Sequence, residues 1–65
     1  MDNHFSENLK NLRKEAKITQ QQLADALQTT IKTISHWETG YTEPSIDQLI
    51  QIAELFHVAL EDLMT

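Results

Sequence analysis

The sequence has 65 residues, enough for one small domain, and no cysteine, so no disulfide can support the fold. Ten acidic and five basic residues give a net charge of −5 at pH 7. The uninterrupted apolar stretches are far shorter than a membrane span requires, and residues 1–4 do not resemble the start of a signal peptide. We therefore expect a cytoplasmic, folded domain without a membrane partner.

The charges are divided unevenly between the two halves of the chain. Residues 1–37 hold all five bases together with four acids, whereas residues 38–65 hold six acids and no lysine or arginine. The first half can therefore face a polyanion although the chain as a whole is acidic. The second half leaves another function open, that of a module that binds a basic partner protein.

An all-α fold follows from the spacing of apolar residues and from the position of the helix breakers. The one glycine and the one proline both lie between residues 40 and 44. Helical spacing predicts a first helix over residues 5–16, with an inward face of Phe5, Leu9, Leu12 and Ala16. A basic stripe occupies another face of this segment, made of Lys10, Arg13, Lys14 and Lys17.

Two threonines mark the starts of the next helices. Thr19 and Gln22 fit a reciprocal capping box, which predicts a helix over residues 20–27 with Leu23, Ala24 and Leu27 inward. Thr30 is the next cap, and it predicts a helix over residues 30–39 with Ile34 and Trp37 in the core. Gly40 supplies the left-handed residue that ends this helix.

The acidic half predicts two further helices, over residues 45–56 and 60–64. Ser45 and Gln48 form a second capping box, and the buried face that follows is Leu49, Ile52, Ala53 and Phe56. The last helix is too short to bury all the apolar residues around it. We therefore expect a homodimer whose surface is formed by Val58, Leu60, Leu63 and Met64.

The second and third predicted helices form the most informative arrangement. Two short helices joined by a tight turn cannot pack side by side, so they cross steeply and the second projects from the surface. An exposed helix of this length fits the major groove of double-stranded DNA, where its N-terminal side chains reach base edges.

The segment TQQQLADALQTTIKTISHWETG, residues 19–40, resembles the helix-turn-helix of the phage-repressor/Cro-like transcriptional regulators of the xenobiotic-response-element type. The matching positions are Gln20, Leu23-Ala24, Leu27, Thr30, Thr33-Ile34-Ser35, Trp37-Glu38 and Gly40. Pro44-Ser45 and residues 49–64 are similar to the fourth and fifth helices of that family. The resemblance implies a five-helix, lambda-repressor-like, single helix-turn-helix domain that binds DNA as a dimer and regulates transcription, in most cases as a repressor.

The resemblance also implies roles for individual residues. Base contacts would come from Ile31, Lys32, Thr33 and His36. Phosphate contacts would come from Gln20, Lys10, Lys14, Lys17, Thr39 and Tyr41. Arg13 and Glu38 would form an internal ion pair between the first and third helices. No cofactor or small-molecule ligand is implied.

Three features depart from the family pattern, and one is Ile31, which stands where a polar or basic residue is frequent. A glycine is frequent at the turn position that Gln28 holds here, and the loop after the third helix is acidic at Glu43 where basic residues are frequent. An enzyme and a metal site are both disfavoured. The three serines and three histidines show no catalytic or ligand spacing, and no glycine-rich loop is present to hold a phosphate.

Overall fold

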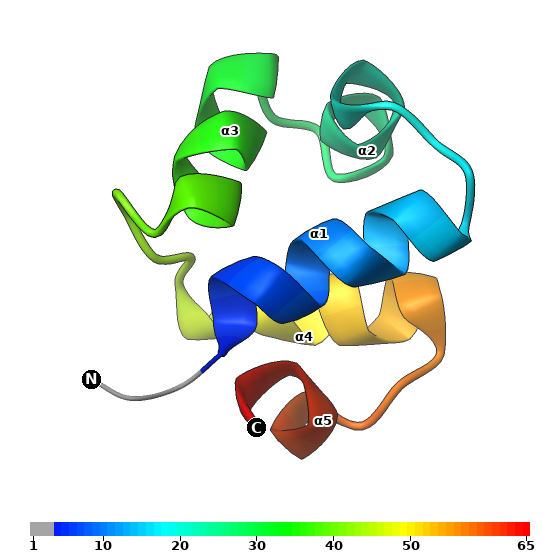
Figure 1. Cartoon of the computed structure of the whole chain (residues 1–65), viewed down its shortest axis with the longest axis vertical. Helices are drawn as coiled ribbons and strands as arrows, with labels where there is room; N and C mark the ends of the chain where they lie inside the picture. Colours follow the sequence, from blue (N-terminus) through cyan, green and yellow to red (C-terminus); the bar gives the residue numbers. More distant parts are fainter. Residues whose placement is uncertain (1–3) are drawn as a thin grey trace.

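The computed structural model describes residues 4–65, which form five helices in the order expected (Figure 1). The helices are α1 (Phe5–Glu15), α2 (Gln20–Ala26), α3 (Ile31–Thr39), α4 (Ile46–Phe56) and α5 (Leu60–Met64). Each bound lies within one residue of the range read from the sequence. Residues 4–65 contain no strand, so the all-α prediction is confirmed, and none of their helices could span a bilayer.

The predicted N-terminal caps are present. Thr19 and Gln22 form the complete reciprocal box, as do Ser45 and Gln48, so each pair satisfies two backbone amides that the helix leaves open. The Thr30 side chain accepts a hydrogen bond from the Thr33 amide. These local bonds explain why the starts of α2, α3 and α4 were accurately predicted.

The C-terminal ends of α1, α2, α3 and α4 share one backbone motif. A residue with positive φ follows each helix, and these residues are Lys17, Gln28, Gly40 and His57. Around Gln28, for example, its amide donates to Asp25 and the Thr29 amide donates to Ala24, which is the paired pattern of a Schellman motif. The sequence indicates this conformation at Gly40 and, through the family pattern, at the turn position of Gln28, but not at Lys17 or His57, and a non-glycine residue is strained in it.

Gln28→Gly is expected to raise the melting temperature, because φ is 57° at Gln28 and glycine has no Cβ to oppose this conformation. Relief of about 1 kcal/mol corresponds to an increase of about 4–8 °C in a domain of this size. Thermal unfolding followed by circular dichroism measures the change. Gln21→Gly, in the body of α2, is the control and should lower the melting temperature. A decrease with Gln28→Gly would contradict the backbone assignment.

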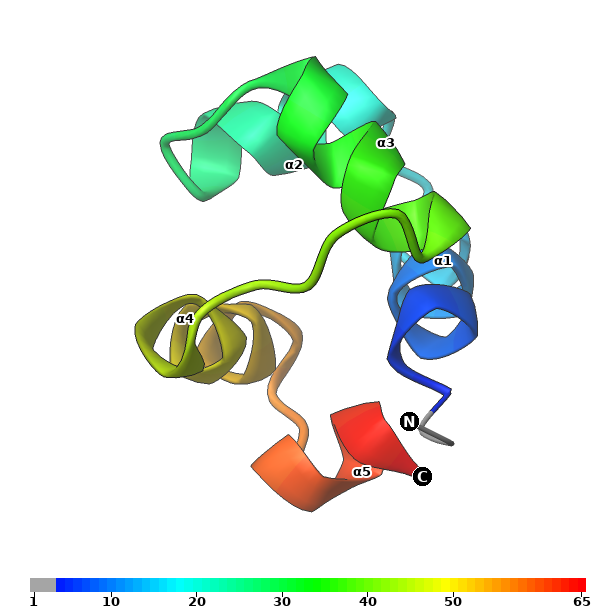
Figure 2. The same ribbon diagram turned by 90° about the vertical axis from the view of Figure 1, so that its left-hand side faces the viewer.

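The core lies between α1, α3, α4 and α5, and α2 covers one end of it (Figure 2). Its buried apolar side chains are Phe5, Leu9, Leu23, Ala24, Ile34, Trp37, Ile52, Ala53 and Leu63. The prediction for Ala16 was wrong, since this residue follows the last turn of α1 and is exposed. Leu12, Leu27, Leu49 and Phe56 pack against the core but are only partly buried.

Leu63 also corrects the expected dimer surface. It is 0% exposed and belongs to the core, so it is not available to a second copy of the chain. The sequence did not indicate how α5 is held against α1. The Asn8 side-chain amide donates to the backbone oxygens of Leu63 at 2.9 Å and Thr65 at 3.1 Å, and these bonds join the end of α5 to α1.

Candidate nucleic-acid interface

Helices α2 and α3 are steeply inclined to each other, since α2 is seen almost end-on in Figure 1 while α3 lies lengthwise. Ile34 and Trp37 anchor one side of α3 in the core. Ile31 and Lys32 are exposed near the start of the helix. The first turn of α3 is therefore an open surface with an apolar and a cationic side chain.

The other expected base contacts are less accessible. Thr33 and His36 are partly buried, and the Thr33 hydroxyl lies 3.0 Å from that of Thr30. The His36 ring packs against the ring of Tyr41, with centroids 4.7 Å apart and planes inclined by 58°. This contact brings the exposed Tyr41 back beside α3, although it lies in the loop that follows the helix. The Thr39 hydroxyl donates to the His36 carbonyl at 3.3 Å.

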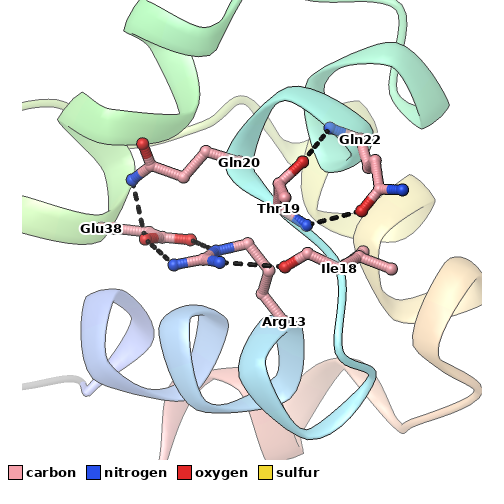
Figure 3. A network of polar contacts seen from close by, with 6 residues as sticks. All are labelled: Arg13, Ile18, Thr19, Gln20, Gln22 and Glu38. Atoms are coloured by element: carbon pink, nitrogen blue, oxygen red, sulfur yellow. Dashed lines mark hydrogen bonds and ion pairs between the residues drawn. The ribbon is translucent and has the colours of Figure 1, made fainter.

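A polar network behind this surface joins three helices (Figure 3). Arg13 Nε of α1 lies 2.7 Å from Glu38 Oε2 of α3, and a second guanidinium nitrogen lies 3.1 Å from Glu38 Oε1. The expected ion pair is therefore present, in the bidentate form that Arg and a carboxylate prefer. A third guanidinium nitrogen donates to the Ile18 carbonyl at 3.0 Å.

The Glu38 side chain is only 2% exposed, so its negative charge is stabilised by these hydrogen-bond donors rather than by water. The hydrogen bond to Glu38 raises the pKa of the Arg13 guanidinium, against the lowering effect of burial. Arg13 therefore remains charged, and it acts as a brace between α1 and α3. The Ile18 carbonyl also belongs to this brace, and no sequence pattern predicts its part in it.

Gln20 takes part in the same network. Its side-chain amide donates to Glu38 Oε1 at 3.1 Å, which uses one of the two N–H bonds of the amide. The bond fixes the start of α2 relative to α3, and a second N–H remains for another acceptor. The sequence suggested a phosphate contact at Gln20 but not this internal bond.

The basic stripe predicted along α1 is divided in the structure. Arg13 points inward to Glu38, and Lys17 lies beyond the end of the helix in a left-handed conformation. Lys14 is exposed and Lys10 is partly buried, one turn or less from Arg13. The lysines therefore lie around the brace between α1 and α3 and do not form one continuous face.

A family model described as helix-turn-helix matches residues 9–63, nearly the whole chain. The chain belongs to the helix-turn-helix family. The resemblance to phage-repressor/Cro-like regulators is thereby confirmed, and the steep α2–α3 pair is the helix-turn-helix unit itself.

Two curated relatives carry the same helix-turn-helix. The chain is 43% identical over 60 residues to the uncharacterized HTH-type transcriptional regulator YqaE of Bacillus subtilis (strain 168), covering 92% of this chain and 52% of YqaE. It is 36% identical over 61 residues to the HTH-type transcriptional activator BcrR of Enterococcus faecalis, covering 94% of this chain and 30% of BcrR. The chain thus spans about half of the first relative and less than a third of the second.

Solved structures confirm the lambda-repressor-like helix-turn-helix fold. The P22 c2 repressor protein in complex with synthetic operator 9T matches with a TM-score of 0.88 and 26% identity, over 94% of this chain and 92% of that chain. Hydroxypropylphosphonic acid epoxidase from S. wedmorenis matches with a TM-score of 0.85 and 32% identity, over 94% of this chain but only 32% of the epoxidase. The likeness to that enzyme is therefore confined to about a third of its chain.

Proposed function

We propose that this chain binds double-stranded DNA in a sequence-specific manner and regulates transcription, with α3 in the major groove. The observation that carries the proposal is the open first turn of α3, where Ile31 and Lys32 are exposed on a helix braced from behind by Arg13 and Glu38. A braced helix avoids the entropic cost of ordering its backbone on binding. The match to a repressor solved with an operator supports the same reading.

Different residues of α3 and of the loop after it contact different groups of the DNA. Lys32 donates to guanine O6 or N7, and Ile31 contacts a thymine methyl group. Thr33 and His36 are partly buried, so they contact bases at the edge of the interface. Tyr41 and Thr39 contact phosphate at the far end of α3. For Thr39, this contact requires its hydroxyl to leave the His36 carbonyl.

Phosphate contacts come from the elements around α3. The second N–H of Gln20, close to the free amides at the start of α2, faces a phosphate oxygen. Lys10, Lys14 and Lys17 contact the backbone beside it. Because these basic residues are few, we expect modest affinity for each monomer. Because they contact phosphates, we expect a steep loss of affinity as salt is raised.

We further propose that the protein acts as a repressor and binds as a homodimer in the cytoplasm. The P22 c2 protein, whose chain is matched almost throughout, carries the name repressor, whereas BcrR, named an activator, is matched over 30% of its length. Leu60 is 40% exposed and lies beside the partly buried Val58 and Met64, which form the remaining dimer surface. The chain acts by binding rather than by catalysis.

Lys32→Ala is expected to relax the choice of base at one position of each half-site, whereas Lys10→Ala should weaken binding to all sequences alike. For the unaltered protein, the logarithm of the binding constant should fall with the logarithm of salt with a slope of about −3 to −6 per dimer. Selection from random duplex DNA, followed by titration at several salt concentrations, measures both effects. Glu54→Gln, on the exposed side of α4, is the control.

The proposal fails if neither lysine variant alters binding to any selected duplex. It also fails if the unaltered chain selects no sequence from the random pool. The dimer surface is tested separately by sedimentation, in which Leu60→Ser should weaken the association of two chains. If the unaltered protein is a monomer, even on its selected duplex, the proposal of a homodimer is wrong.

A further inference from the structure

Helix α4 carries apolar side chains on its solvent side as well as on its core side. Ile52 and Ala53 are buried, as the helical spacing predicts. Ile46 is nevertheless 68% exposed, Ile50 is 42% exposed and Leu55 is 38% exposed. Ile46 and Ile50 are one turn apart and form an apolar row, whereas a helix that only covers a core normally has polar residues there.

A hollow lies nearer the C-terminal end of the same helix. It has a volume of about 380 Å³ and is lined by Ala26, Leu27, Gln28, Gln51, Glu54 and Leu55. It therefore lies between the end of α2 and the second half of α4, which face each other across the side of the molecule in Figure 2. An exposed leucine beside a hollow of this kind is a place where an apolar side chain of a partner can insert.

Carboxylates surround the apolar row. Glu43, Asp47 and Glu54 are exposed, and residues 38–65 contain no lysine or arginine to balance them. Within residues 4–65 the ion pairs are those of His4 with Glu7 and Arg13 with Glu38, so the carboxylates around this row are not neutralised by the fold. An apolar row with an acidic border is complementary to a helix that alternates apolar and basic residues.

We propose that the outer face of α4, defined by Ile46, Asp47, Ile50 and Glu54, binds a basic amphipathic helix of a partner protein. Duplex DNA is repelled by the same carboxylates. A second copy is also disfavoured, because a two-fold contact brings two acidic faces together and residues 38–65 hold no lysine or arginine to pair with the carboxylates. The face belongs to α4 and not to α3, so a partner can bind here while α3 is on DNA.

The experiment is a selection of randomised helical peptides by display on the full chain, followed by fluorescence anisotropy with the selected peptides. We expect peptides in which lysine or arginine alternates with leucine or isoleucine, and weaker binding as salt is raised. Ile50→Ser should weaken binding about tenfold or more, because it removes one of the two apolar side chains of the row. Lys32→Ala is the matched control and should bind the peptides unchanged.

Ile46→Ser is a second test variant, because Ile46 is the more exposed of the two and its substitution is expected to leave the fold intact. Several outcomes overturn the proposal. These are the absence of enriched peptides, enrichment of acidic or uncharged peptides, and unchanged affinity in both serine variants. Sedimentation in which the unaltered chain is a dimer and Ile50→Ser is a monomer also overturns it, since a second copy would then occupy the face.

Discussion

Glu38→Ala is expected to leave most of the protein unfolded at 25 °C. The substitution removes the only carboxylate that faces Arg13 in the described structure and leaves a mostly buried guanidinium without its partner. Breaking a buried ion pair on one side costs about 3–5 kcal/mol. A domain of this size has a free energy of unfolding of only about 3–5 kcal/mol, so the loss is comparable to the whole stability.

Urea unfolding followed by Trp37 fluorescence, at 10 and 25 °C, measures the effect. The control is Glu54→Ala, which removes an exposed glutamate of α4 and should change stability by less than about 0.5 kcal/mol. The double variant Arg13→Met with Glu38→Leu should recover much of the loss, because it leaves no unpaired charge. A loss below about 1 kcal/mol for Glu38→Ala would mean that this pair contributes no more than a surface ion pair.

Leu63→Ala is the second substitution with a large expected effect. Leu63 is fully buried, and the five-residue helix α5 is too short to be stable without its contacts to the rest of the domain. Truncation of a buried leucine to alanine costs about 2–5 kcal/mol. We therefore expect a strong loss of cooperative unfolding, and release of α5 from Asn8 and α1.

Leu60→Ala is the matched control, since Leu60 belongs to the same helix but is 40% exposed. It should cost less than about 1 kcal/mol. Urea unfolding and sedimentation of both variants separate a core role from an interface role. If Leu63→Ala kept the stability of the unaltered chain but lost self-association, the residue would belong to the dimer surface that its sequence position first suggested.

The helices were predictable because the information that specifies them is local. Thr19, Thr30 and Ser45 each bond to an amide three residues away, so a short stretch of sequence contains both partners. Ile34 and Trp37 of α3 followed from helical spacing, and both are buried. The pairing of Arg13 with Glu38 required a family resemblance, because the two residues lie 25 positions apart and only the packing of α1 on α3 brings them together.

The remaining features depend on contacts that no local pattern contains. Gln20 donates to Glu38, and Asn8 holds the end of α5, only because helices distant in sequence meet. Leu63 looked exposed because so short a helix carries several apolar residues, and its burial depends on how α5 lies against α1. The strained ends at Lys17 and His57 lack the glycine that would have predicted them. The DNA contacts assigned to α3 remain predictions.

The shared helix ending has a consequence for how the protein can adapt. Lys17, Gln28 and His57 have the backbone conformation in which glycine is most favourable, yet none of them is buried in the core. Each is a position at which a single exchange can add heat tolerance without repacking the interior. A lineage that moves to a warmer habitat therefore has several independent first steps available, and two of them, at Gln28 and His57, lie outside every contact proposed here for DNA.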